Sequence, residues 1–197
     1  DDGVRRAFGR PYTTADIERC MDEALDAGCD RLDLFFMVGL SEQTYDSVMG
    51  TVDYCARLLA RQARAGDHGL IPFVPPLAPF LDPGSRAFEN PERYGYRLHA
   101  RTLEEHRRAL VAPSWKYVLN YETRWLNRDA IVAATYEAGR RMNRLKAEHG
   151  LVPADVADAT EKRIARAVEL IAEIDRIVAL PDADERRARL RAVKPQV

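Results

Sequence analysis

A strand, a helix and a second strand follow one another early in the chain, and this order constrains the fold most. The run DRLDLFFMVGL (30–40) is short, apolar and flanked by turn residues, as expected for a parallel strand buried on both faces. Apolar residues then recur at helical spacing from Tyr45 to Leu59, and GLIPFVPPLAPFLDPG (69–84) returns as an extended segment. This order predicts a right-handed βαβ crossover that joins two parallel strands.

The second strand is expected to end its sheet. Pro72, Pro75 and Pro76 lie within it, and proline cannot donate a hydrogen bond to a neighbouring strand. Two parallel strands alone do not form a stable sheet, so the missing strands lie before Asp1, in another chain, or nowhere. The beginning of the chain, DDGVRRAFGRPY, has no initiator Met and no signal-like segment, and we interpret it as the middle of a longer chain.

The predicted elements change from mixed strands and helices to helices alone at about residue 88. An acidic variant of the capping box, Thr13 with Asp16, predicts a helix that stops at Gly28. We predict an α/β part over 1–88 and a helical part over 89–197. In the second part the expected features are a capping box at Thr102 and Glu105, a helix from Asn127 to about Glu148, a longer helix after Pro153, and a polar, frayed tail over 181–197.

Composition excludes several classes of protein. Lys plus Arg (30) nearly balance Asp plus Glu (31), so no excess charge indicates nucleic acid as a partner. No apolar run reaches the roughly 20 residues that a membrane span needs. The three cysteines are an odd number at wide spacing, which favours a reducing cytoplasm. We interpret Cys20, Cys29 and Cys55 as buried thiols, and the four histidines as surface residues.

The corner after the first strand is the candidate site. Alternation along the strand directs Leu32, Leu34, Phe36 and Val38 toward helices, and Asp33, Phe35, Met37 and Gly39 toward the opposite face, where Asp33 needs a polar partner. Met37 is the last side chain on that face, and Gly39 leaves room for a flat apolar ligand. We expect Ser41 to cap the next helix, whose first amides could meet a polar part of the ligand. Alternatively, Gly39 only permits a tight turn and Ser41 is only a cap.

Several segments resemble radical SAM enzymes. FMVGLSEQT resembles the corner after the fifth strand of these enzymes, often GLPGET or GLPEQT and described as GxIxGxxE. Met37, Gly39 and Glu42 occupy the Ile, second Gly and Glu positions, whereas Phe35 replaces the first Gly and Ser41 stands where Pro is common. RRAFGRPYTTADI and PFVPPLAPFLDPGS are similar to the neighbouring segments, and PSWKYVLNYETRW and ATYEAGRRMNRLK resemble proteins that also carry a cobalamin-binding domain.

The resemblance implies an α/β fold, with the last βα units of a partial (βα)6 TIM-like barrel followed by a mostly α-helical C-terminal extension. Such enzymes use a 4Fe-4S cluster to cleave S-adenosylmethionine into a 5′-deoxyadenosyl radical, and a CxxxCxxC loop holds the cluster. By motif position Met37 would contact adenine, Gly39 would permit its close approach, and Glu42 would support the corner. CxxxCxxC is absent from this sequence, so no catalytic or metal-binding residue is predicted in it.

The leading hypothesis is therefore a fragment of a cytoplasmic radical SAM enzyme whose substrate the sequence does not identify, with cobalamin as a further cofactor. Its partner would be the N-terminal remainder of the parent protein. The parent would be an enzyme, whereas this part alone would not be one. The alternative is a non-catalytic binding module whose sheet edge is completed by a partner chain.

Overall fold

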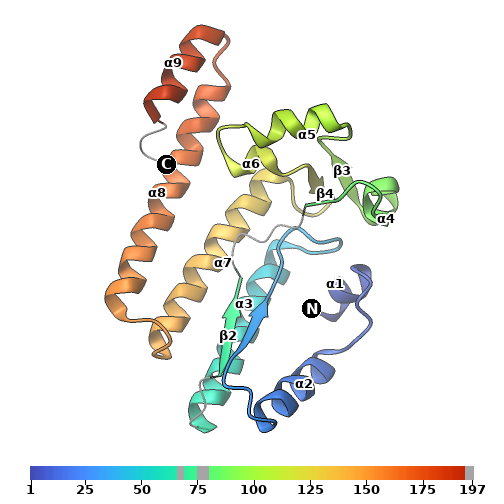
Figure 1. Cartoon of the computed structure of the whole chain (residues 1–197), viewed down its shortest axis with the longest axis vertical. Helices are drawn as coiled ribbons and strands as arrows, with labels where there is room; N and C mark the ends of the chain where they lie inside the picture. The colour runs from blue at the N-terminus through green and yellow to red at the C-terminus, as the bar shows by residue number, and fades with distance from the viewer. Residues whose placement is uncertain (66–68, 75–79, 194–197) are drawn as a thin grey trace.

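The computed structural model describes residues 1–65, 69–74 and 80–193, so the predicted edge prolines Pro75 and Pro76 lie outside the described residues. The chain has a mixed α/β structure in which helices predominate and which contains two small sheets (Figure 1). The first part contains α1 (Asp2–Ala7), α2 (Thr14–Asp26), β1 (Leu32–Phe35), α3 (Tyr45–Ala65) and β2 (Leu70–Phe73).

The predicted strand, helix and strand are confirmed. β1 and β2 pair in parallel, with Leu32 opposite Leu70 and Phe35 opposite Phe73, and α3 forms the crossover between them. The predicted helix before β1 is α2, and its capping box is present because Thr13 and the side chain of Asp16 bond each other's backbone N–H groups.

Helices cover one face of the parallel sheet. Met21 of α2 and Leu58 of α3 form a buried cluster with Leu70, and Leu32 and Leu34 pack against it. The opposite face is open, and the Phe35 side chain is 62% exposed. The prediction that this strand is buried on both faces is therefore wrong for the described residues, because on the opposite face the Lys146 side chain reaches Phe73 of β2 but leaves Phe35 of β1 exposed.

A second, antiparallel sheet was not predicted. It pairs β3 (Tyr96–Leu98) with β4 (Tyr121–Thr123), and Tyr96 lies opposite Thr123. The residues around it form α4 (Arg86–Glu89), the short 3-10 helix η1 (Pro91–Tyr94), α5 (Leu103–Leu110) and α6 (Trp115–Val118). The capping box predicted at the start of α5, from Thr102 and Glu105, is confirmed.

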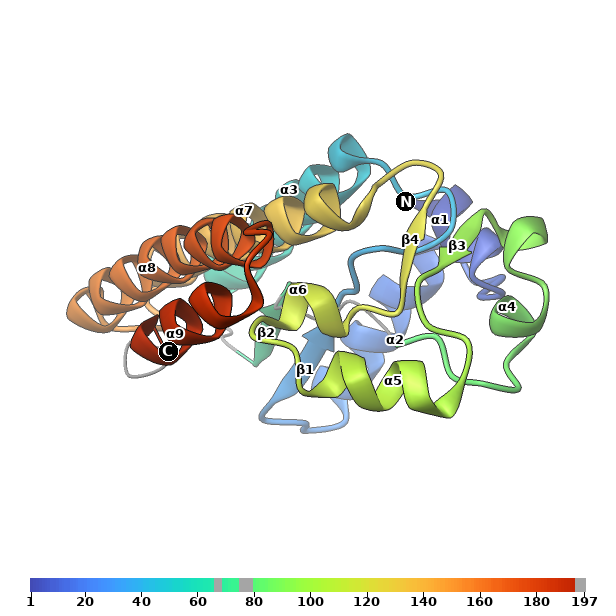
Figure 2. The same cartoon turned by 90° about the horizontal axis from the view of Figure 1, so that it is seen from above.

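The long C-terminal helices follow the predictions closely, with one exception. α7 (Arg128–Glu148) begins after Asn127, whose side chain accepts a hydrogen bond from the Ala130 N–H group, and α8 (Ala154–Val178) follows Pro153. α8 packs on α7, and α9 (Ala183–Val193) folds back on α8 (Figures 1 and 2). The prediction of a frayed tail is wrong up to Val193, because that side chain is buried against α8.

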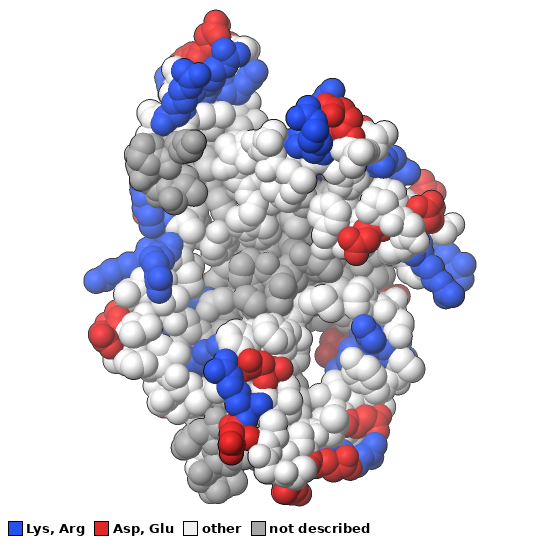
Figure 3. Space-filling model, viewed as in Figure 1, with Lys and Arg blue, Asp and Glu red and all other residues white. Residues whose placement is uncertain are grey.

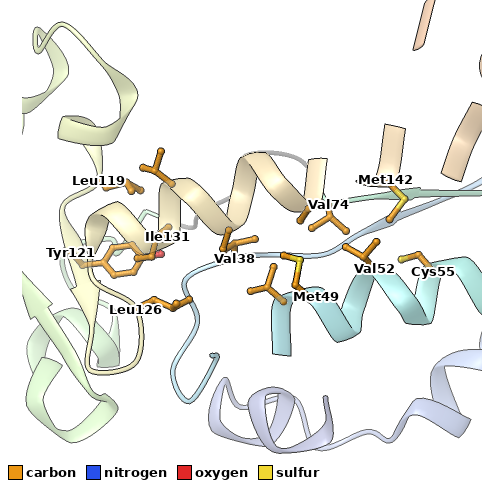
Figure 4. Close-up of a cluster of buried hydrophobic side chains, with 14 of the residues drawn as sticks. Val38, Met49, Val52, Cys55, Val74, Leu119, Tyr121, Leu126, Ile131 and Met142 are labelled. Atoms are coloured by element: carbon orange, nitrogen blue, oxygen red, sulfur yellow. The ribbon is translucent and has the colours of Figure 1, made fainter. Parts of the chain in front are cut away.

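The largest hydrophobic core lies where α7 packs against α3 and the corner after β1. Figure 4 shows Val38 from the corner, Met49 and Val52 from α3, and Ile131 and Met142 from α7 in this cluster. Its members come from both sides of residue 88. The division into 1–88 and 89–197 remains a prediction.

Charged side chains are spread over the surface. Figure 3 shows Lys and Arg beside Asp and Glu, mostly toward the periphery of this face, in keeping with the near balance of charges. Within the described residues, every helix is too short or too polar to cross a bilayer.

Candidate functional site

The corner between β1 and α3 is held in its turn by a glutamine side chain. Gln43 is buried, and its Oε1 accepts hydrogen bonds from the N–H groups of Gly39 (2.8 Å) and Leu40 (3.1 Å). Its Nε2 donates to the carbonyl of Met37 at 3.0 Å. These two amides precede Ser41, so they are not the first amides of the following helix, which we expected to face a ligand. Sequence reasoning missed Gln43, because its role depends on a turn that no local pattern signals.

The second half of the corner is tied to the antiparallel sheet. Ser41 donates its backbone N–H to the Tyr96 hydroxyl (2.9 Å) and its own hydroxyl to the carbonyl of Tyr94 (2.7 Å). The prediction that Ser41 caps α3 is therefore wrong. α3 begins at Tyr45, and Thr44 Oγ1 accepts from the N–H group of Ser47 at 3.2 Å.

Gly39 lies in the left-handed region, with φ of +88°. A Cβ atom added there would lie 2.7 Å from the Tyr121 hydroxyl and 3.3 Å from Ile131 Cδ1. The space that this glycine leaves is thus filled by side chains of β4 and α7, and Figure 4 shows Tyr121 and Ile131 beside Val38 of the corner. Glycine is needed here both for its backbone conformation and for this close packing.

Met37 and Glu42 lie in different surroundings. Met37 is half-buried and lines a groove of about 900 Å³, whose other walls come from α1, α2, β1 and α3. Glu42 is exposed and adopts φ of 63°, an uncommon conformation for a residue other than glycine. Of the three predicted cofactor-binding residues, Met37 alone is among the residues that line this groove. The roles assigned to all three remain predictions.

The open face of the parallel sheet carries aromatic rings and a lysine. The rings of Phe35 and Phe73 stack with centroids 5.1 Å apart, and Lys146 Nζ of α7 lies 3.7 Å from the Phe73 centroid. Burial lowers the pKa of Lys146, although Asp33 nearby opposes this shift. The polar partner that Asp33 requires is Arg31, whose Nε lies 2.9 Å from Asp33 Oδ1. This face can therefore receive a flat apolar group beside a positive charge.

The cysteines do not converge on a metal site. Cys55 is buried in the main core, where burial raises the pKa of its thiol to about 12, and Cys29 donates to the Arg31 carbonyl. Cys20 is exposed at the groove, which corrects the prediction of a buried thiol. In the part of the chain that the structure describes, no three His, Cys, Asp or Glu side chains are grouped as metal ligands. These residues do not fit a 4Fe-4S cluster.

Among the described histidines, His106 differs from its prediction as a surface residue, and His68 lies outside the described residues. His106 is buried, its Nδ1 lies 2.8 Å from the Thr102 carbonyl, and its Nε2 lies 3.2 Å from the Asn120 side-chain nitrogen. Asn120 in turn bonds both backbone groups of Leu81. His106 is part of a buried polar network that joins α5 to the segment before α4.

No protein-family model, curated protein or solved structure matches this chain.

Proposed function

We propose that this chain supplies one wall of an S-adenosylmethionine pocket in a radical SAM enzyme. In this proposal β1, α3 and β2 are the last βα units of a partial (βα)6 TIM-like barrel, and the later helices form its C-terminal extension. The observation that carries the proposal is the position of Met37. It follows the carboxyl end of β1 closely, and its side chain lines the groove of about 900 Å³. Ligands of open parallel sheets bind outside the carboxyl ends of the strands.

The surroundings of Met37 support this role. Gln43 fixes the backbone on both sides of Val38, so the Met37 side chain projects from a rigid support. Phe35, which also lines the groove, offers an exposed aromatic ring near the same strand end. A thioether and an aromatic ring are suited to hold a flat adenine group. Gly39 supports the site indirectly, because it lets Tyr121 pack beneath the corner.

The proposal places the cluster and its ligands outside residues 1–197, because the described thiols do not fit a cluster. S-adenosylmethionine, when bound in the whole enzyme, would supply the adenosyl radical. The residues of this chain would hold the adenine end and exclude water from it. Glu42, exposed at the turn, would support the corner from outside the groove. Cobalamin as a second cofactor is supported by the resemblance alone, and the cytoplasm as the location by the number and spacing of the cysteines.

The test is a titration of the isotope-labelled chain with S-adenosylmethionine, followed by the amide signals of residues 37–40 in NMR spectra. The expected result is a saturable shift of these signals with a Kd of about 1 mM, since one wall alone holds a ligand weakly. Methionine without the nucleoside should produce no such shift. Saturable binding elsewhere, or no binding, would contradict the proposal.

Met37→Glu is the variant of choice, and Glu42→Ala is its matched control. Met37→Glu places a charge where adenine should lie and should abolish the shift, whereas Glu42→Ala should change it little. Gly39→Val is less informative, because its side chain would collide with Tyr121 and Ile131 and disturb the corner itself.

A further inference from the structure

We propose that the groove beside β1 receives an extended polypeptide segment from outside residues 1–197, which joins the sheet as a third strand parallel to β1. This inference deepens the proposed function and rests on it in one respect, because a partial barrel of parallel strands implies a strand at this edge; it adds the kind of segment that binds there. Its own support is the hydrogen-bonding groups of β1 and the walls of the groove, and it does not depend on the ligand of Met37.

The backbone of β1 is paired along one edge. The N–H groups of Leu32 and Phe36 donate to the carbonyls of Gly69 (2.7 Å) and Phe73 (2.9 Å). Because successive residues of a strand point their backbone groups to opposite sides, Asp33 and Phe35 direct theirs away from β2. Among the described residues no strand pairs with that second edge. Unpaired N–H and C=O groups in a row are a template for another strand.

The outer edge of β2 differs, because it is closed. The Leu70 N–H group donates to Gln62 Oε1 of α3 at 3.2 Å, and Pro72 has no N–H group. Pro72 alternates with Ile71 and Phe73, so its nitrogen faces away from β1. One edge of this sheet is therefore terminated by its own residues, whereas the other edge remains available.

The groove has room for a strand at the available edge. It follows β1 from Leu32 to Met37 and is bounded on the opposite side by α2 and on the helical face by α3. The apolar stripe of α2 is only partly covered, since Ile17 and Ala24 are half-buried and Cys20 is exposed. A strand added to β1 would direct every second side chain toward this stripe, as Leu32 and Leu34 already do.

The direction of the added strand follows from α2. This helix runs back against the direction of β1 and packs on it (Figure 1), as the crossover helix of a βαβ unit does. Such a helix joins parallel strands, so the vacant position next to β1 suits a parallel strand.

Charge indicates the chemistry of the segment. Arg10 and Arg57 line the groove, and neither forms an ion pair with a described carboxylate; Arg57 lies over the Tyr54 ring. Arg5, in contrast, is paired with Asp2. Two unpaired guanidinium groups beside an apolar stripe favour a segment in which apolar residues alternate with acidic ones.

The test uses a synthetic peptide of about eight residues, a common strand length, in which valine alternates with glutamate. Hydrogen exchange of the Asp33 and Phe35 amides and alkylation of the Cys20 thiol report occupancy of the groove. At saturation both rates should fall at least about tenfold. A peptide with lysine in place of glutamate should bind more weakly, and one with a central proline should not protect either amide.

Asp33→Pro is the decisive variant, with Asp33→Ala as its control. Proline at this position removes an outward N–H group and leaves the bonds of Leu32 and Phe36 to β2 in place. Asp33→Pro should bind the peptide with at least about tenfold lower affinity than Asp33→Ala does. Equal binding by the two variants, equal protection by the proline-containing peptide, or no protection would overturn the proposal. In both variants binding is read at the Phe35 amide and the Cys20 thiol, because proline at position 33 has no amide. These readouts are separate from the signals of residues 37–40 that report S-adenosylmethionine binding.

Discussion

At the scale of single residues, the corner after β1 depends on a glycine that serves two purposes. Gly39→Ala should destabilise the fold, because a left-handed conformation costs about 1–2 kcal/mol for other residues and overpacking against Tyr121 costs about 1–3 kcal/mol more. Gly28→Ala is the matched control, since Gly28 has a similar φ of +89° and nothing within 4 Å of the added Cβ atom. Urea unfolding should show the larger loss for Gly39→Ala; equal losses would refute the packing role.

Two tyrosines on facing strands make a second matched pair. Tyr96 accepts a hydrogen bond from the Ser41 N–H group, whereas the buried hydroxyl of Tyr121 has no partner among the described residues. Tyr96→Phe should lower the free energy of unfolding by about 1–2 kcal/mol, and Tyr121→Phe should leave it unchanged or raise it by up to about 1 kcal/mol. A larger loss from Tyr121→Phe would show that its hydroxyl is bonded.

His99 gives the fold a dependence on pH. Burial lowers the pKa of His99 in the folded state, and Arg128 adds to this effect although Glu122 opposes it. Protons therefore bind the unfolded chain first, so stability is full above about pH 6.5 and falls as the pH decreases below that value. After allowance for solvent screening, the loss should be below about 1 kcal/mol. The free energy of unfolding of His99→Gln should fall less than that of the original chain as the pH decreases below about 6.5. An equal fall in both proteins would show that His99 does not cause the pH dependence.

At the scale of elements, a lysine joins three helices. Lys116 of α6 is buried and forms ion pairs with Asp129 of α7 and Asp175 of α8, and Tyr117 also donates to Asp175. Burial opposes these ion pairs, which nevertheless raise the pKa of Lys116. Lys116→Met should destabilise the fold by about 3 kcal/mol, because it leaves Asp175 without its cation.

The control for this prediction is Asp129→Asn. The Asp129 side chain is 74% exposed, so its loss should cost less than about 1 kcal/mol. Chemical unfolding measures both variants, and hydrogen exchange in α8 should increase mainly for Lys116→Met. Equal effects would show that Lys116 does not fasten α8.

Elements with local signals could be predicted from the sequence. The parallel strands, α2, α5, α7 and α8 have apolar periodicity or capping residues within a few positions of their ends. β3 and β4 could not be predicted in this way, because each has three residues and their pairing spans two intervening helices. The same limit explains the site: Met37 could be placed by strand alternation, whereas Gln43 and Lys146 act through tertiary contacts.

At the scale of the whole molecule, the parallel sheet is covered on one face and closed at one edge. Helices α2 and α3 cover one face, and Gln62 and Pro72 close the outer edge of β2. The remaining face and edge meet at Phe35, beside the groove that Met37 lines. Errors in the sequence predictions also concern this region: Cys20 and Phe35 have apolar neighbours in sequence, but both side chains are exposed. The proposed cofactor wall and the proposed strand position both arise from this unfinished side of the sheet.

The most direct measurement of this account is the hydrogen exchange of individual backbone amides in β1. An edge strand predicts alternation: the amides of Leu32 and Phe36, which bond to β2, should be protected, whereas those of Asp33 and Phe35 should exchange at nearly unprotected rates. Protection of all four amides to the same extent would show that the second edge of β1 is already paired, and would contradict the account.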